Sequence, residues 1–294
     1  MTLRYSSALL PNFALYHGRL QCMNRYVVLF ACPLLALLVS GCATPPIPVP
    51  AMKIDTTFTS KSQDSRAQFL ILHFTNENFE RSLKILTEGS VSSHYLVDIN
   101  PPDVYRLVDE SRRAYHAGIS RWGTSAGLNA SSIGIEIVNL GNQKGPLGTI
   151  WFDYPDAQMD VVIALVKDIV KRHQIRADRI LGHSDIAPGR KVDPGPRFPW
   201  KRLADEGLIP WPDAAYVAAK KLVYELQLPN IEWFQQQLAL YGYGTPQTGV
   251  MDKGTRDVLE AFQLRFRQSN FDGLPDAETA AILDALTRPE ALVK

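Results

Sequence analysis

Cysteine is scarce in this sequence and confined to its beginning. The three cysteines are Cys22, Cys32 and Cys42, and residues 43–294 contain none. A disulfide framework is therefore excluded from most of the chain, and packing or a metal ion must stabilise that part instead. An excess of charge is missing as well, because 31 Lys and Arg residues face 30 Asp and Glu residues, for a net charge of +1. This balance gives no indication of a nucleic-acid partner, since phosphate-backbone binding usually demands a basic excess.

The apolar run VVLFACPLLALLV at 27–39 is too short to cross a bilayer, which takes about 20 residues. It follows a polar and positive pair at 24–25, a layout typical of a secretory signal peptide. The run ends in SGC at 40–42, which resembles the lipobox of bacterial lipoproteins, where cleavage precedes the cysteine and the thiol is lipidated. The alternative is an uncleaved anchor or a buried helix.

We therefore expect a signal peptide at 23–41, with Cys42 as the lipidated first residue of the mature protein. By resemblance to Gram-negative lipoproteins, a residue other than aspartate after the cysteine, here Ala43, favours the outer membrane, with the protein facing the periplasm. Residues 42–52 form a proline-rich linker, which is an extended and semi-rigid spacer. Residues 1–22 precede a second methionine and are interpreted as an upstream extension.

An α/β domain is predicted over residues 53–212. Residues 156–173 have the apolar periodicity of one helical face and predict a helix. Runs of strand length and composition occur at 69–74, 93–98, 104–108 and 133–138.

Two residues in these predicted strands can carry chemistry. His73 lies in FLILHF, and a lone histidine in an apolar run is more often a satisfied core residue than a ligand. Glu136 lies in the middle of IGIEIV, although a carboxylate is rarely buried without a partner. It shares a strand face with Gly134, where the missing side chain leaves room for something to approach. Glu136 is either part of a buried salt bridge or a general base facing a cleft.

The segment GHSDIAPGRKVDPGP at 182–196 carries the strongest chemical signal. Six of its fifteen residues are Gly or Pro, so we expect a shaped loop without regular secondary structure. His183 and Asp193 could turn inward onto one ion, and His73 would add a second nitrogen. Two nitrogens and one oxygen make a three-ligand catalytic zinc set with a fourth position left for water.

Five motifs occur in order along the predicted domain: ILHFT (71–75), SSHYLV (92–97), AYHAGISRW (114–122), SIGIEIVN (132–139) and HSDIAPGRKVDPGPRFPW (183–200). Through these motifs the sequence resembles the type-2 N-acetylmuramoyl-L-alanine amidases over roughly residues 55–212. This family includes phage amidase lysozymes, cytosolic anhydro-muropeptide amidases and animal peptidoglycan recognition proteins. The resemblance implies a mixed β-sheet flanked by helices. It also implies hydrolysis of the amide bond between the lactyl group of N-acetylmuramic acid and L-alanine, in peptidoglycan or muropeptides, including anhydro forms.

The resemblance implies a role for each matching residue. Zn²⁺ is expected on His73, His183 and Asp193. Glu136 matches the family's catalytic acid and Lys191 its catalytic lysine. Zinc then makes water available as a nucleophile at neutral pH, and Glu136 takes its proton and returns one to the leaving amine. Zinc and Lys191 stabilise the oxyanion; the alternative for the lysine is a solvated loop charge.

The matching motifs contain three further residues of interest. His116 is expected to line the substrate cleft. Trp122 is interpreted either as a cleft wall against sugar or peptide, or as a core aromatic. His94 is expected to be structural.

A small all-α domain of three helices is predicted at 231–290, joined to the first domain by a helix-like segment at 213–230. The segments GVMDKGT (249–255) and GLPDAET (273–279) echo each other, and each is a turn followed by an apolar-periodic helix with an aspartate near its N-terminus. With the apolar-periodic segment at 231–243, this arrangement resembles the small three-helix peptidoglycan-binding domain. The alternative is a helical packing or dimerisation module.

Three functions follow from these patterns. The first is a zinc amidase anchored in the outer membrane. The second is a non-catalytic muropeptide-binding protein on the same fold, although all five expected site residues are present. The third is another wall hydrolase, such as a zinc endopeptidase or a glycosidase. A glycosidase needs two cooperating carboxylates, and only Glu136 stands out as buried.

Overall fold

The computed structural model describes residues 52–146 and 148–289. The chain divides into two units, of which the second, residues 60–294, is compact. Residues 52–59 form no helix or strand. The expected signal peptide and Cys42 lie outside the described residues. Within the described part of the chain, no helix has both the length and the apolar character needed to cross a membrane.

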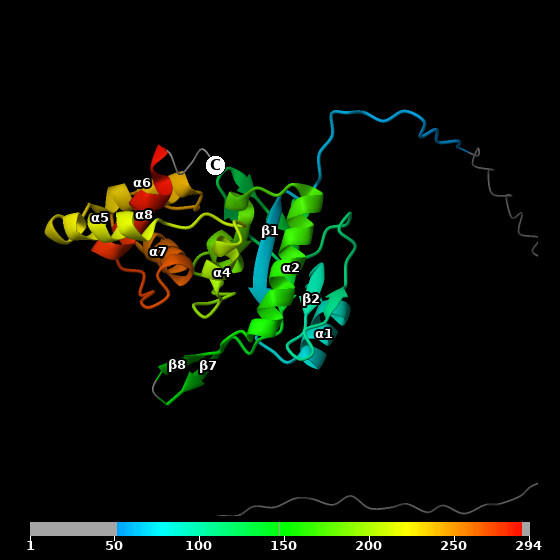
Figure 1. Ribbon diagram of the computed structural model, residues 1–294, viewed down its shortest axis with the longest axis horizontal. Coiled ribbons are helices and arrows are strands. Elements are labelled where there is room, and N and C mark those ends of the chain that lie inside the picture. The colour runs from blue at the N-terminus through cyan, green and yellow to red at the C-terminus, as the bar shows by residue number, and fades with distance from the viewer. Residues whose placement is uncertain (1–51, 147, 290–294) are drawn as a thin grey trace, which may run out of the picture. The chain divides into compact units, whose positions relative to one another are not determined.

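A mixed five-stranded sheet is the centre of the second unit and confirms the predicted fold class (Figure 1). The strand order is β3-β2-β6-β1-β9, with β3 antiparallel to β2 and the remaining pairs parallel. The expected strand at 69–74 matches its observed bounds, and the others are shifted or shorter. The strands are β1 (Phe69–Phe74), β2 (Tyr95–Val97), β3 (Val104–Arg106), β6 (Ser132–Ile137) and β9 (Ile180–Gly182).

Because side chains alternate along a strand, β1, which lies between β6 and β9, contributes to two cores. Leu70 and Leu72 pack on one side with helix α2, Asp156–His173, which has the bounds that its periodicity predicts. Phe69 and Ile71 point to the opposite side and belong to a second core, which includes the C-terminal helices. A smaller cluster lies under helix α1, Phe79–Glu88. His73 continues the face of Phe69 and Ile71, so this histidine is on the side of the second core.

Short elements occupy the connections between the main strands. The predicted loop at 182–196 contains one helical turn, α3 (His183–Ile186), which corrects the expectation of a segment without regular structure. The turn forms because the Asp185 carboxylate accepts a hydrogen bond from the Gly182 amide (2.8 Å) at its start. The other short elements are β4 (Arg121–Trp122), β5 (Ser125–Ala126), η1 (Leu128–Ala130), β7 (Asn142–Gly145), β8 (Gly148–Trp151), η2 (Ala177–Arg179) and α4 (Trp200–Asp205).

The C-terminal region is all-α, as predicted, but the segment expected to be a connector is part of it. Helix α5 packs along α8, and Tyr224 of α5 donates a hydrogen bond to Asp284 of α8 (2.9 Å). Asp252 and Asp276 cap α7 and α8 through the amides three residues on, which confirms their expected role. The four helices are α5 (Ala214–Leu226), α6 (Ile231–Tyr241), α7 (Lys253–Phe266) and α8 (Ala277–Thr287).

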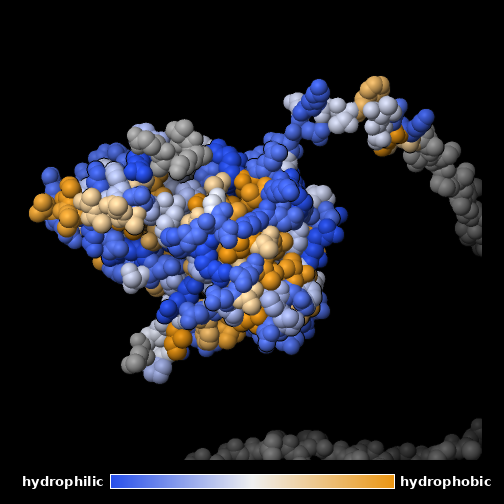
Figure 2. Space-filling model, in the orientation of Figure 1, coloured by the Kyte–Doolittle hydropathy of each residue, from blue (hydrophilic) through white to orange (hydrophobic). Residues whose placement is uncertain are grey.

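Helix α5 has one face in contact with α8 and one face open to solvent. None of its residues is fully buried, and Leu222, Val223 and Leu226 are exposed. Figure 2 shows the apolar surface that gathers at this end of the helical region.

Candidate metal centre

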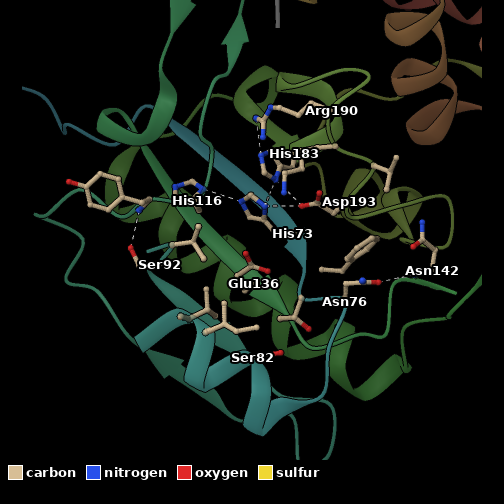
Figure 3. A pocket seen from close by; sticks show the side chains of 18 residues that line it. His73, Asn76, Ser82, Ser92, His116, Glu136, Asn142, His183, Arg190 and Asp193 are labelled. Atoms are coloured by element: carbon tan, nitrogen blue, oxygen red, sulfur yellow. Dashed lines mark hydrogen bonds and ion pairs between the residues drawn. The ribbon is translucent and has the colours of Figure 1, made fainter. Parts of the chain in front are cut away.

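Three candidate ligands meet at the carboxyl ends of two neighbouring strands (Figure 3). His73 is near the end of β1, and His183 directly follows β9. These strands are parallel and paired with Leu72 opposite Gly182, so the residues that follow these two lie side by side. Asp193 returns to the same place because its carbonyl accepts a hydrogen bond from the Ser184 amide (2.9 Å).

Their side chains bring three donor atoms to one point. The Nδ1 atoms of His73 and His183 are 3.0 Å apart, and Oδ2 of Asp193 lies 2.9 and 3.1 Å from them. All three residues are buried, with 1%, 4% and 6% of their surface exposed. Tetrahedral ligands about 2.0–2.1 Å from a zinc ion would be about 3.3 Å from one another. The spacing of the donors therefore fits a small ion held between them.

The protonation states also suit a metal. Burial, together with the neighbouring His183, lowers the pKa of His73 to about 4, so this imidazole is neutral at pH 7. Burial alone would raise the pKa of Asp193, but the two histidines hold it well below its usual range. Neutral imidazole and carboxylate are the forms that coordinate metals.

A chain of hydrogen bonds fixes which nitrogen of His73 carries the proton. The single hydroxyl proton of Ser132 goes to the Leu128 carbonyl (2.6 Å), so its Oγ must accept from Nε2–H of His116 (3.1 Å). Nδ1 of His116 is then unprotonated and accepts from Nε2–H of His73 (3.0 Å). The lone pair of His73 Nδ1 is therefore directed at the three-donor cluster. Burial holds the pKa of His116 well below its usual range, which is consistent with the neutral ring that this chain requires.

His183 is oriented in the same sense by a backbone carbonyl. Its Nε2 lies 3.2 Å from the Ala117 oxygen, which can only accept a hydrogen bond, so Nε2 carries the proton and Nδ1 faces the cluster. Arg190 donates to the same carbonyl (2.9 Å) and to the Ile119 carbonyl (2.6 Å), and so holds the segment that orients His183. Partners of this kind set ligand geometry in metal sites.

Gly134 makes room for His116. A Cβ atom at this position would lie 2.6 Å from both Cγ and Nδ1 of the His116 ring, which is far inside contact distance. The Gly134 amide also donates to Nδ1 of His94 (3.0 Å), and His94 is fully buried. Gly134 therefore leaves room for the His116 ring. The expected structural role of His94 agrees with its place in the interior.

A cleft of about 370 Å³ opens beside the three donors. Glu136 and Lys191 both line it, and the Glu136 atom Oε2 is buried with no hydrogen-bond partner among the described residues. Burial and then Asp193 raise the pKa of Glu136 well above its ordinary value, against the opposing charge of Lys191. An unpaired, poorly solvated carboxylate of this kind is a good proton acceptor.

The structure places His116 and Trp122 in different surroundings. His116 lines the cleft, as expected, although its ring nitrogens contact His73 and Ser132. Trp122 is not in the cleft: it is 6% exposed and packs edge-on against Tyr243 in the second core, with ring centroids 4.9 Å apart. The cleft-wall interpretation of Trp122 is therefore corrected in favour of its alternative, a core aromatic.

Sequence reasoning missed Ser132 and Arg190, although both lie within matched motifs. Their roles depend on hydrogen bonds to residues that are distant along the chain, or to backbone carbonyls. The charge of Arg190 next to Lys191 was a visible signal, whereas a serine at the start of a strand carries none.

A mixed sheet that ends in a buried His-His-Asp group, beside an unpaired carboxylate in a cleft, is typical of metal-dependent hydrolases. Comparison with known proteins specifies the class. Residues 63–196 match the family model of N-acetylmuramoyl-L-alanine amidase, and residues 227–283 match that of a peptidoglycan binding domain.

Relatives match over nearly their whole length. The N-acetylmuramoyl-L-alanine amidase AmiD of Escherichia coli K12 is 38% identical over 276 residues, covering 90% of this chain and 98% of AmiD. The crystal structure of AmpDh3 from Pseudomonas aeruginosa with anhydromuramic pentapeptide is 38% identical, with a TM-score of 0.73, over 81% of this chain and 97% of AmpDh3. The structure of E. coli AmiD with anhydro-N-acetylmuramic acid-L-Ala-D-γ-Glu-L-Lys has a TM-score of 0.73 at 36% identity, over 83% and 98% of the two chains.

The chain belongs to the N-acetylmuramoyl-L-alanine amidase family and is a hydrolase of this type. The buried group of His73, His183 and Asp193 is typical of the zinc site of that family.

The close approach of Gly134 to His116 can be tested with Gly134→Ala. We expect the new methyl group to displace the His116 ring, to destabilise the fold by about 1–3 kcal/mol, and to weaken zinc binding about 10–100-fold by releasing His73. Calorimetric unfolding and competition with a chromophoric chelator measure the two effects. Ile133→Val, on the opposite face of β6, is the control: it should cost about 1 kcal/mol and leave zinc affinity unchanged. Unchanged zinc affinity in Gly134→Ala would contradict the orienting role of His116.

Proposed function

We propose that this amidase holds Zn²⁺ on His73, His183 and Asp193 and uses Glu136 and Lys191 as its catalytic residues. The observation that carries the proposal is the convergence of two Nδ1 lone pairs and one carboxylate oxygen within 3.1 Å of one another. The donor set, two nitrogens and one oxygen, is that of a catalytic rather than a closed structural zinc site.

The cleft residues then have distinct tasks. When bound, zinc supplies Lewis-acid chemistry, which polarises a carbonyl and lowers the pKa of water. Glu136 accepts a proton from the attacking water on its unpartnered Oε2 and delivers a proton to the amine of L-alanine as the amide bond breaks. Lys191 is exposed at the cleft, where its ammonium group can stabilise negative charge on the carbonyl oxygen.

We infer that the substrates are muropeptides, including anhydro forms, as well as peptidoglycan. The crystal structures of AmpDh3 and AmiD contain anhydromuramyl peptides, and both relatives are aligned over nearly their full length. The cleft supports this inference, because its lining includes Tyr115, Ile85 and Val91 in addition to the three donors. It is therefore large enough for more than the scissile amide.

A glycosidase is not favoured by the cleft. Asp193 and Glu136 are the acidic residues among the described residues that line it. Asp193 is held by both histidines, so Glu136 lacks the second free carboxylate that glycoside hydrolysis requires.

Digestion of purified peptidoglycan and of an anhydro-muropeptide tests the activity and the cofactor together. With Zn²⁺ we expect new L-alanine amino termini, and we expect none after treatment with a chelator, because the nucleophile would no longer be activated. Amino-terminal labelling and mass spectrometry identify the products. Restoration by added Zn²⁺ is the control for irreversible damage. New reducing ends, or full activity in the metal-free protein, would contradict the proposal.

Glu136→Gln separates proton transfer from metal binding. The amide keeps the shape of the side chain but cannot accept the proton, so kcat should fall by about 10²–10⁴-fold. The zinc content, measured by elemental analysis, should stay at one ion per chain. Loss of zinc in this variant would mean that Glu136 is a metal ligand instead.

We propose that residues 53–212 form the catalytic domain and that the helical region from 231 to 290 binds the wall polymer and raises the local substrate concentration. The family matches at 63–196 and 227–283 support this division. We also propose that Cys42 is lipidated and anchors the protein in the outer membrane, facing the periplasm. The sequence pattern at 27–42 is the support for this anchor.

Cys42→Ala tests the anchor. Because lipidation requires the thiol, the wild-type chain expressed in a Gram-negative host should fractionate with outer membranes, whereas the variant should not. Immunoblots of separated membrane fractions and metabolic labelling with a fatty acid provide the readout. Cys32→Ala, within the proposed signal peptide, is the matched control and should still be labelled. Equal labelling of the Cys42→Ala variant would exclude this residue as the lipid site.

A further inference from the structure

A buried ion pair joins the C-terminal helices to the candidate metal centre, and the reaction described above does not use it. Arg265 of α7 donates from Nη1 to Oδ2 of Asp185 in α3 at 2.8 Å. The two residues are only 1% and 0% exposed. A charge pair at such depth is costly to desolvate, so its position next to a ligand-bearing turn calls for an explanation.

The carboxylate of Asp185 connects three separate segments. Oδ2 accepts from the Gly182 amide (2.8 Å) as well as from Arg265, and Oδ1 accepts from the hydroxyl of Tyr243 (2.5 Å). Tyr243 follows helix α6 and is 2% exposed. Two of these three donors therefore come from the C-terminal helical region.

The bond between Gly182 and Asp185 closes the turn that contains His183. Asp185 lies two residues after this candidate ligand, inside the four-residue helix α3. Such a short helix has few internal hydrogen bonds, and its geometry therefore depends on the partners of Asp185. A displacement of the Asp185 carboxylate would alter the direction in which His183 presents Nδ1.

Arg265 also holds the surroundings of this turn. It donates to the Ile180 carbonyl in β9 (3.2 Å), just before Gly182. Its guanidinium carbon lies 4.3 Å from the centre of the Trp200 ring. That ring packs closely against Gly182, where an added Cβ would be 3.2 Å from its Cζ2 atom. One side chain of α7 thus contacts the strand before the turn, the turn itself and the aromatic ring behind it.

We propose that Arg265 and Tyr243 are positioning residues of the metal centre, and that the C-terminal helices thereby set the zinc affinity of the amidase domain. This inference rests on the proposed zinc site at His183. It assigns the helical region a second task besides binding polymer, because the region supplies two of the hydrogen bonds that hold the ligand-bearing turn.

The test uses full-length variants and Zn²⁺ as the probe. Arg265→Met removes the cation but keeps much of the side-chain volume, and it should raise the zinc dissociation constant about 10–100-fold, as loss of outer-shell partners typically does. Tyr243→Phe removes one hydrogen bond and should raise the constant by a smaller factor. Arg265→Lys keeps the charge and should recover part of the affinity. Chelator competition measures the constants, and the visible spectrum of the cobalt-substituted protein reports the ligand geometry.

Gln263→Met is the matched control for a merely structural role. Gln263 is fully buried on the same helix and donates a hydrogen bond to the Leu274 carbonyl (2.9 Å), but no hydrogen bond joins it to Asp185 among the described residues. This variant should lower the unfolding temperature while its zinc dissociation constant stays within twofold of wild type. Equal weakening in Gln263→Met and Arg265→Met would overturn the inference.

The remaining outcomes separate the inference from the proposed function. If the wild-type chain binds no Zn²⁺, the proposed function fails and the inference fails with it. If the wild-type chain binds Zn²⁺ and Arg265→Met binds it equally well, only the inference is overturned. If Arg265→Met does not fold, Tyr243→Phe decides, because it removes a single hydroxyl group. A raised zinc dissociation constant in this variant supports the positioning role, and an unchanged constant overturns it.

Discussion

The buried cluster of His73, His183 and Asp193 constrains the hydrogen bonds of the residues around it. One imidazole nitrogen each of His73 and His183 and a carboxylate oxygen of Asp193 lie within 3.1 Å of one another, and to bind one ion each of these atoms must present a lone pair to it. Each ring can meet this requirement only if its other nitrogen has a committed acceptor. Those acceptors are Nδ1 of His116 for His73 and the Ala117 carbonyl for His183. Two residues of β6 serve this arrangement, because Ser132 accepts a hydrogen bond from His116 and Gly134 leaves room for the His116 ring.

The sheet brings the two histidines of the cluster together. Adjacent parallel strands end at the same edge, which is why His73 and His183 meet although 110 residues separate them. The face of β1 that carries His73 also carries Phe69 and Ile71, whose second core is completed by the C-terminal helices. The helical region is therefore packed into the same body as the site and is not a module carried on a flexible tether.

Local sequence was a good guide where one physical effect dominates. The apolar run at 69–74 and the helical periodicity at 156–173 predicted β1 and α2 within their observed bounds. The segment 182–196 was less predictable because glycine and proline argue against a helix, while α3 forms through the side chain of Asp185. The place of Trp122 could not be predicted from local sequence either, because an aromatic residue in this motif suits a cleft wall and a core equally well. Its partner Tyr243 is distant along the chain.

The sequence by itself determined the chemistry: two histidines and an aspartate for a metal, a glutamate inside an apolar strand, and a lysine beside the last ligand. It also indicated the strands that carry His73 and Glu136. The tertiary structure alone decided which nitrogen of each ring faces the metal position, which carboxylate stays unpartnered, and what holds the ligand-bearing turn. These properties depend on hydrogen bonds between residues far apart in the chain, 43 positions for His73 with His116 and 80 for Asp185 with Arg265. Local sequence patterns do not predict such pairings, because they form only when the folded chain excludes water from both partners.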